Sequence, residues 1–191
     1  MTLDRLMAAD GLHASITEPA WRNFVEYVAE TMDVGPGTRV FQVNCGGGSL
    51  LCPLWENGYV VGGLDHSPDK IRLAAEAMPE GRFRVGEPSA LDPAEPWDVV
   101  VACGSFGSFP DLDYARGVLA RMAAKATHAM AVLEVPDIDR TEGAPLGGLF
   151  YDRAWMFKAL AEIGASAVQI EEQKIEGYAL APYRFNVFAR L

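Results

Sequence analysis

Residues 39–65, RVFQVNCGGGSLLCPLWENGYVVGGLD, decide the fold of this chain. A short apolar run over 40–43 ends in NCGGG (44–48), and a second apolar run after an amphipathic segment ends in the acid Asp65. Glycines let the backbone turn tightly and approach a ligand closely, and the start of the next helix offers free N–H groups. An acid at the tip of the second strand, about 20 residues further on, can accept hydrogen bonds from ribose hydroxyls. The stretch therefore predicts strand, glycine-rich turn, helix and strand, which is half of a nucleotide-binding unit.

Two common phosphate-binding motifs do not fit this turn. A dinucleotide fingerprint needs G-x-G-x-x-G, and Leu51 stands where its third glycine would be. A Walker A loop needs G-K-[ST] after its glycines, and no lysine is near. A nicotinamide-dependent oxidoreductase is therefore the least favoured interpretation.

The pattern resembles motifs I and II of class I S-adenosylmethionine-dependent methyltransferases, whose usual form is V-L-D-x-G-C-G-x-G and then an acid that closes the next strand. The residues that fill this frame are Val40, Phe41, Gln42, Asn44, Cys45, Gly46, Gly48 and Asp65. The resemblance covers the chain after residue 35 and implies a Rossmann-like α/β fold with a seven-stranded sheet. Strand–helix alternation predicts a doubly wound, mostly parallel sheet. The last two expected strands, over 167–170 and 184–189, predict a C-terminal antiparallel hairpin at one edge.

Two residues depart from the motif. Gln42 stands in place of the usual acid, and Asn44 in place of the first glycine. In the family the acid helps to hold the methionine ammonium, whereas a neutral Gln accepts a hydrogen bond without adding charge attraction. Asn tolerates unusual backbone angles better than other non-glycine residues, so we expect the turn to be kept. The two departures leave an alternative open: a methyltransferase-like protein that does not methylate, either an accessory nucleoside-binding subunit or one with a repurposed pocket.

The resemblance implies S-adenosylmethionine as cofactor and S-adenosylhomocysteine as product, with a set of cofactor-binding residues near the carboxyl ends of the strands. These are Gln42, Asn44, Cys45, Gly46, Gly48, Asp65, His66, Glu87, Cys103 and Gly104. In the family an acid near the position of Glu87 accepts from the adenine amine, and His66 would lie beside the adenine or the ribose. Ligands of open α/β sheets bind outside the carboxyl ends of the strands, which places Cys103, Gly104, Ser105 and Phe106 by the sulfonium and the acceptor.

Candidate catalytic residues follow from the chemistry of an in-line methyl transfer. The protein mainly binds, aligns and excludes water, so no nucleophile or metal motif is required. An acceptor of high pKa would need a base, for which the candidates are His13, Glu134 and Tyr151. Glu134 stands near the end of an otherwise apolar strand, where a carboxylate is costly unless it is paired or lines a cleft.

Candidate substrate-binding residues come from two segments. N-terminal helices often form part of the substrate lid in the resembled family, so Trp21 and Tyr27 are lid candidates together with His13. Phe106 and Phe109 follow the fourth expected strand and could shape an apolar acceptor pocket. We expect an N-terminal helical lid over residues 1–35 and an S-adenosylmethionine-binding domain over residues 36–191, within a single domain overall.

Composition limits the partners. The 191 residues carry a net charge of −10 and no cluster of Lys and Arg, which disfavours nucleic acid and anionic membranes. No apolar run approaches a membrane span, and the N-terminus lacks the apolar region of a signal peptide. The three cysteines show no C-x-x-C spacing, which argues against a disulfide framework and a zinc site. We therefore expect a cytoplasmic methyltransferase that acts on a small-molecule metabolite or biosynthetic intermediate, with homodimer formation left open.

Overall fold

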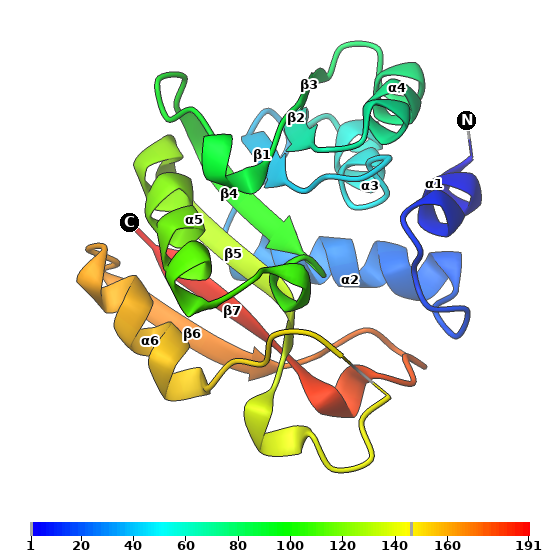
Figure 1. Cartoon of the computed structure of the whole chain (residues 1–191). Helices are drawn as coiled ribbons and strands as arrows, with labels where there is room; N and C mark the ends of the chain where they lie inside the picture. The colour runs from blue at the N-terminus through cyan, green and yellow to red at the C-terminus, as the bar shows by residue number, and fades with distance from the viewer. Residues whose placement is uncertain (1, 146) are drawn as a thin grey trace.

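The computed structural model of the chain describes residues 2–145 and 147–191. They form a seven-stranded sheet with helices on both faces (Figure 1). The strands are β1 (Arg39–Val43), β2 (Val60–Asp65), β3 (Arg82–Val85), β4 (Trp97–Cys103), β5 (Ala126–Pro136), β6 (Ala167–Glu172) and β7 (Arg184–Arg190). The helices are α1 (Leu3–Ala9), α2 (Glu18–Thr31), α3 (Leu51–Glu56), α4 (Pro68–Ala77), α5 (Leu112–Lys125) and α6 (Arg153–Glu162).

The sheet has the strand order β3-β2-β1-β4-β5-β7-β6. Strands β1 to β5 pair in parallel, and β7 pairs antiparallel with both β5 and β6. The order reverses between β1 and β4, because β2 and β3 lie on one side of β1 and β4 lies on the other. Ligands of open α/β sheets bind at such a switch point. The expected doubly wound, mostly parallel sheet with a C-terminal antiparallel hairpin is therefore confirmed.

The central strands are buried on both faces, so the molecule has two apolar cores. In β4, Val99 and Val101 belong to the core under α1 to α4, whereas Val100 and Ala102 belong to the core under α5 and α6. Successive side chains of a strand point to opposite faces, so a continuous apolar run requires cover on both sides. Each fully buried valine of this kind contributes about 1.5–3 kcal/mol. The two cores hold the carboxyl ends of β1 and β4 in fixed positions.

The N-terminal residues form two separate helices. As the sequence predicts, Thr17 caps α2, and its side chain accepts a hydrogen bond from Ala20 N at 3.3 Å. The apolar stripe of α2 packs into the core, where Trp21 and Phe24 are each 2% exposed. The shorter α1 ends next to the glycine-rich turn, and both helices lie at the same end of the molecule (Figure 1). The N-terminal segment is thereby placed beside the switch point.

Strand β5 begins earlier than the apolar pattern indicates. The pattern predicts a strand over 129–135, but pairing with β4 begins at Ala126, opposite Trp97. Thr127 Oγ1 also donates to Trp97 O at 3.3 Å. Hydrogen bonds to the neighbouring strand, rather than side-chain hydropathy, set this end of β5.

Two further properties concern residues 2–145 and 147–191. Every helix in this part of the chain is too short or too polar to cross a bilayer. These residues also contain no group of three or more His, Cys, Asp or Glu side chains placed to hold a metal ion.

Candidate cofactor and substrate site

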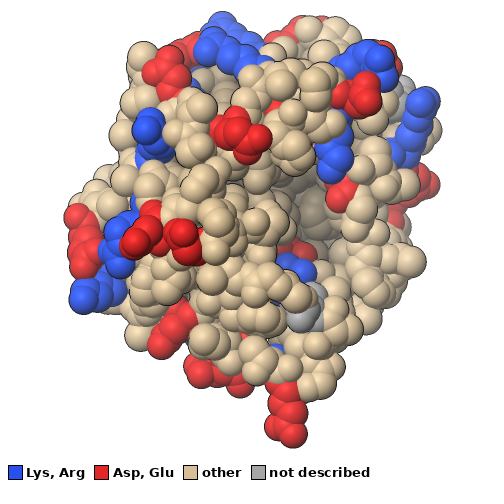
Figure 2. All heavy atoms as spheres, in the orientation of Figure 1, with Lys and Arg blue, Asp and Glu red and all other residues tan. Residues whose placement is uncertain are grey.

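A cavity of about 370 Å³ lies at the carboxyl ends of β1 and β4, with the N-terminal segment as one wall. Its volume falls within the range of small-molecule sites, roughly 300–1,000 Å³. The molecular surface is hollowed on this side of the molecule, beside the N-terminal helices (Figure 2). The sequence-predicted residues in its wall are His13, Trp21, Gln42, Asn44, Cys45, Gly46, Asp65, His66, Cys103, Gly104 and Glu134. Ser105, expected there as well, also lies in the wall, and further residues of it include Asp10, Ser49, Lys70, Tyr178 and Arg184.

Asp65 holds the glycine-rich turn against the start of α4. Its Oδ2 accepts from Gly46 N and its Oδ1 accepts from Ser67 N, each at 2.9 Å. The side chain is buried, yet it lines the cavity. Asn44 adopts the left-handed region with a φ of 53°, so the turn is kept as its residue type predicts. A carboxylate has about four acceptor positions, so Asp65 retains capacity for a ligand.

Asp10, the residue after α1, binds the same turn from the other side. Its carboxylate accepts from Gly47 N and, at 3.0 Å, from Ser49 N. A Cβ on Gly46 would lie 2.2 Å from Asp10 Oδ1, so this close approach requires glycine. Burial raises the pKa of Asp10, although the hydrogen bonds with Ser49 and Gly47 oppose the rise. Sequence reasoning missed Asp10 because no local pattern connects it with the distant turn.

Besides Arg184 Nε, three side-chain oxygen atoms in the cavity wall are buried without a hydrogen-bond partner among the described residues. They are Gln42 Oε1, Asn44 Oδ1 and Ser105 Oγ. Buried polar groups are normally paired, and an unpaired one costs about 1–3 kcal/mol. Two of the three belong to β1 and the turn after it, and the third follows β4. A ligand with N–H or O–H groups at the switch point would satisfy them.

Glu134 enters the cavity because β5 contains a bulge. Val132 pairs with Val187 and Val135 with Phe185, so one residue of β7 faces two residues of β5. Glu134 has a φ of 63°, which is uncommon for a residue with a side chain. Bulges re-aim side chains, and strained backbone concentrates at functional sites. No sequence pattern marks the bulge itself, although the acid in an apolar strand indicates that something unusual occurs there.

The Glu134 carboxylate sits in a buried polar network. Tyr178 Oη donates to its Oε2 at 3.0 Å, Gln173 Nε2 donates to its Oε1 at 2.6 Å, and Arg184 Nη1 lies 3.8 Å from Oε2. Burial raises the pKa of Glu134 to about 7, while the Arg184 charge and the Tyr178 hydrogen bond oppose the rise. A carboxyl with this pKa can exchange a proton near neutral pH, which is the property of a general base or acid.

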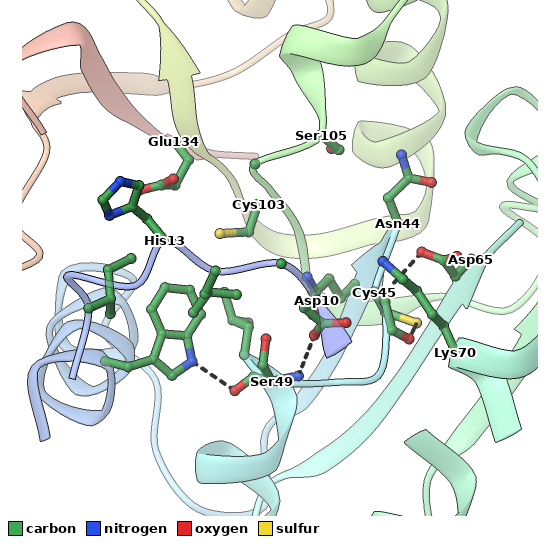
Figure 3. A pocket seen from close by; sticks show the side chains of 18 of the residues that line it. Asp10, His13, Asn44, Cys45, Ser49, Asp65, Lys70, Cys103, Ser105 and Glu134 are labelled. Atoms are coloured by element: carbon green, nitrogen blue, oxygen red, sulfur yellow. Dashed lines mark hydrogen bonds between the residues drawn. The ribbon is translucent and has the colours of Figure 1, made fainter. Parts of the chain in front are cut away.

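His13 stands at the same end of the cavity as Glu134, and Asp10, Asn44, Asp65 and Lys70 stand toward the glycine-rich turn (Figure 3). The His13 ring centroid is 6.0 Å from that of Tyr178, and its Nδ1 lies 3.0 Å from Ser15 Oγ. The side chain is exposed. His13 is therefore placed at the mouth of the cavity rather than in its buried end.

Several sequence-predicted residues lie outside this cavity. Phe106, Phe109 and Tyr151 pack in the core under α5 and α6. Tyr27 donates from its Oη to Glu171 and packs edge-on against a β7 ring. Their apolar or aromatic character reflects core packing, which the sequence alone does not distinguish from a pocket wall.

Two predicted cofactor residues also lie apart from the cavity wall. Glu87 is exposed and lines a separate hollow of about 140 Å³. Gly48 faces α4, where an added Cβ would meet the Met78 side chain at 2.4 Å. Gly48 thus allows close packing of α4, and Glu87 follows β3, the strand at one edge of the sheet.

The placement of Tyr151 yields a prediction. Its side chain is 0% exposed, and its Oη donates to Phe106 O at 2.9 Å. We expect Tyr151→Phe to lower the free energy of unfolding by about 1–2 kcal/mol, because a buried carbonyl loses its donor. Urea unfolding would measure this loss. A methyl-transfer assay of the same variant should show an unchanged kcat. A large fall in kcat without loss of stability would instead support a catalytic role for Tyr151.

The sequence of this chain resembles that of one curated methyltransferase. No protein-family model matches the chain. The chain is 32% identical over 133 residues to nocamycin O-methyltransferase from Saccharothrix syringae, a match that covers 64% of the chain and 46% of that enzyme. The chain thus spans less than half the length of this curated relative.

Solved structures resemble the chain over nearly its whole length. One is an amino pentose methyltransferase from Micromonospora echinaspora, solved with bound S-adenosylmethionine, which is 15% identical to this chain. The match spans 100% of this chain and 98% of that enzyme, with a TM-score of 0.75. Another is magnesium protoporphyrin IX methyltransferase from Synechocystis PCC 6803, also solved with bound S-adenosylmethionine, which is 18% identical to this chain. The match spans 90% of this chain and 79% of that enzyme, with a TM-score of 0.69. These likenesses establish the fold. The resemblance expected from residues 39–65 is confirmed: this chain has the fold of class I S-adenosylmethionine-dependent methyltransferases.

Proposed function

We propose that this chain transfers a methyl group from S-adenosylmethionine to a hydroxyl or amine of a small molecule. One observation carries the proposal: a single cavity joins the unpaired acceptors beside the glycine-rich turn to the buried carboxyl of Glu134. The first set suits the binding of a nucleoside and an amino acid, and the carboxyl suits the removal of a proton from an acceptor.

The residues around the turn fit the cofactor. Asp65 has free acceptor positions for ribose hydroxyls. The unpaired oxygens of Gln42 and Asn44 would accept hydrogen bonds at the amino acid end, and Ser105 Oγ can donate or accept. When bound, S-adenosylmethionine supplies an electrophilic methyl carbon. The chain contributes alignment, and the N-terminal segment covers one side of the site.

At the other end, Glu134 acts as general base. With a pKa of about 7 it is partly ionised near neutral pH, so it can accept the proton that the acceptor hydroxyl or amine loses. Tyr178 and Arg184 hold the carboxylate in place and favour its charged form. Such positioned proton transfer contributes typically 10²–10⁴-fold to rate.

The Tyr178 hydrogen bond gives a prediction about pH. Removing a donor to the carboxylate disfavours its charged form, so Tyr178→Phe should raise the pKa of Glu134 above its value of about 7. The acid limb of the kcat profile should therefore move to higher pH, with little change in kcat on the alkaline side. A profile measured from acid to alkaline pH tests the shift, and a limb that moves to lower pH would contradict the role of Tyr178.

Two observations bear on the chemical class of the molecule that accepts the methyl group. The matched relative is an O-methyltransferase, which favours an oxygen acceptor. The wall holds the cations Lys70 and Arg184 as well as three carboxylates, so its charge does not select the acceptor, but the carboxyl of Glu134 suits a hydroxyl or amine that loses a proton. We therefore place small alcohols, phenols and amines of metabolites or biosynthetic intermediates first among the substrates.

A direct assay tests the proposal. The purified chain is incubated with S-adenosylmethionine and a panel of small alcohols, phenols and amines, and S-adenosylhomocysteine and product masses are measured. Methyl transfer predicts that the two products form together in equal amounts and depend on the acceptor. Consumption of the cofactor without any methylated product would instead favour a methyltransferase-like protein that uses the pocket for another reaction.

A further inference from the structure

Asp10 brings a carboxylate into the cavity from outside the sheet. It follows α1, and both of its hydrogen-bond partners are neutral N–H groups of the glycine-rich turn, on Gly47 and Ser49. Lys70 lies in the same wall, and its charge favours the ionised form of Asp10, but the hydrogen bonds of the carboxylate run to the backbone N–H groups. A carboxylate has about four acceptor positions. Because the Ser49 hydroxyl also interacts with this carboxylate, at least one position remains for a group inside the cavity.

The unpaired acceptors that line the same cavity as Asp10 indicate what that group should be. Gln42 is 4% exposed and its Oε1 has no partner among the described residues, and Asn44 Oδ1 is unpaired as well. Both line the same cavity as Asp10. Two unpaired amide oxygens and one carboxylate form a wall of acceptors. A primary ammonium, with three donors and a positive charge, matches such a wall.

We propose that Asp10, Gln42 and Asn44 together form the subsite for the ligand's primary ammonium group. This inference rests on the proposed function, in which the ammonium belongs to the methionine end of the cofactor. Position 42 then needs no charge of its own, because the N-terminal segment supplies it. The same carboxylate fastens α1 to the glycine-rich turn, so it both closes the cavity and binds the ligand.

The geometry also allows an opposite role, which the experiment must separate. The N–H groups of Gly47 and Ser49 could serve a ligand carboxylate if Asp10 left them. In that case Asp10 would compete with the ligand, and removal of its charge would tighten binding. The ammonium subsite predicts weaker binding instead.

The test is calorimetric titration of the full chain and its Asp10→Asn variant with two ligands. S-adenosylhomocysteine carries an ammonium as its only cationic group, and 5′-methylthioadenosine lacks the amino acid altogether. We expect Asp10→Asn to weaken S-adenosylhomocysteine binding by about 10- to 100-fold, the worth of a hydrogen bond with a charged partner. Binding of 5′-methylthioadenosine should not change.

Two variants control for structure and charge. Asp4→Asn removes the same charge from an exposed position of α1 and should leave both affinities unchanged. Asp10→Glu keeps the charge, so it should bind S-adenosylhomocysteine more tightly than Asp10→Asn does. Circular dichroism and thermal melting check that each variant folds.

The outcomes are distinct. Tighter or unchanged S-adenosylhomocysteine binding by a folded Asp10→Asn variant would overturn the ammonium subsite while leaving the proposed function intact. An equal loss for both ligands would also overturn it, because Asp10 would then act through the shape of the site alone. Failure of the unaltered chain to bind either ligand would refute the proposed function, and the inference with it.

Discussion

Replacing Glu134 by Gln is expected to lower kcat by about 10²–10⁴-fold, the usual contribution of a positioned general base. Gln has nearly the same shape and still offers an oxygen to Tyr178 or Gln173, so the buried network can persist. It cannot accept the proton of the acceptor. Because the acceptor still binds, KM should change much less than kcat.

A general base at Glu134 also predicts how the kcat of the unaltered chain depends on pH. Burial raises the pKa of Glu134 from an ordinary 4.5 to about 7, so the carboxyl is protonated at lower pH and cannot serve as a base. The kcat should therefore fall as pH decreases below about 7, close to tenfold per pH unit. The Glu134→Gln variant should lack this limb. A limb that remains in the variant, or a kcat close to that of the unaltered chain, would show that the base is elsewhere, with His13 the first candidate.

Replacing Asp65 by Ala is expected to have the second large effect, on cofactor affinity. Loss of two hydrogen bonds between a carboxylate and ribose hydroxyls should weaken binding by about 10²–10⁴-fold. Two backbone N–H groups, of Gly46 and Ser67, also lose their partner, which should lower the free energy of unfolding by about 1–3 kcal/mol for each that stays buried. Titration calorimetry and urea unfolding measure the two effects separately.

Asp69 offers a matched control for this substitution. It is an exposed acid in the first turn of α4, so Asp69→Ala removes the same charge close by without touching the cavity. Affinity should then stay the same. If Asp69→Ala weakens binding as much as Asp65→Ala, long-range charge rather than direct contact would account for the loss, and the ribose assignment would be wrong.

The fold was predictable because its signals are local. The apolar run of β4, the glycine-rich turn, and the Ser67-Pro68 start of α4 each carry their own pattern. The structure keeps all three, and their alternation is enough to predict a doubly wound sheet. The start of β5 at Ala126 was not predictable, since it depends on pairing with Trp97 rather than on hydropathy.

The cavity was predictable where its residues follow strands, and in the N-terminal segment for His13 and Trp21. Gln42, Asn44 and Cys103 stand at strand ends, and the structure brings them together. Asp10 and Tyr178 come from the two ends of the chain and meet the cavity through tertiary packing. The predictions for Phe106, Phe109 and Tyr151 failed to separate pocket from core, because aromatic side chains are common in both.

The proposed function requires that this cavity binds S-adenosylmethionine. Calorimetric titration of the purified chain with S-adenosylmethionine, and separately with S-adenosylhomocysteine, tests it most directly. We expect one site per chain with a micromolar Kd for each ligand, weakened in Asp65→Ala and preserved in Asp69→Ala. Absence of binding by either ligand to the folded chain would contradict it, and would leave the methyltransferase fold serving another purpose.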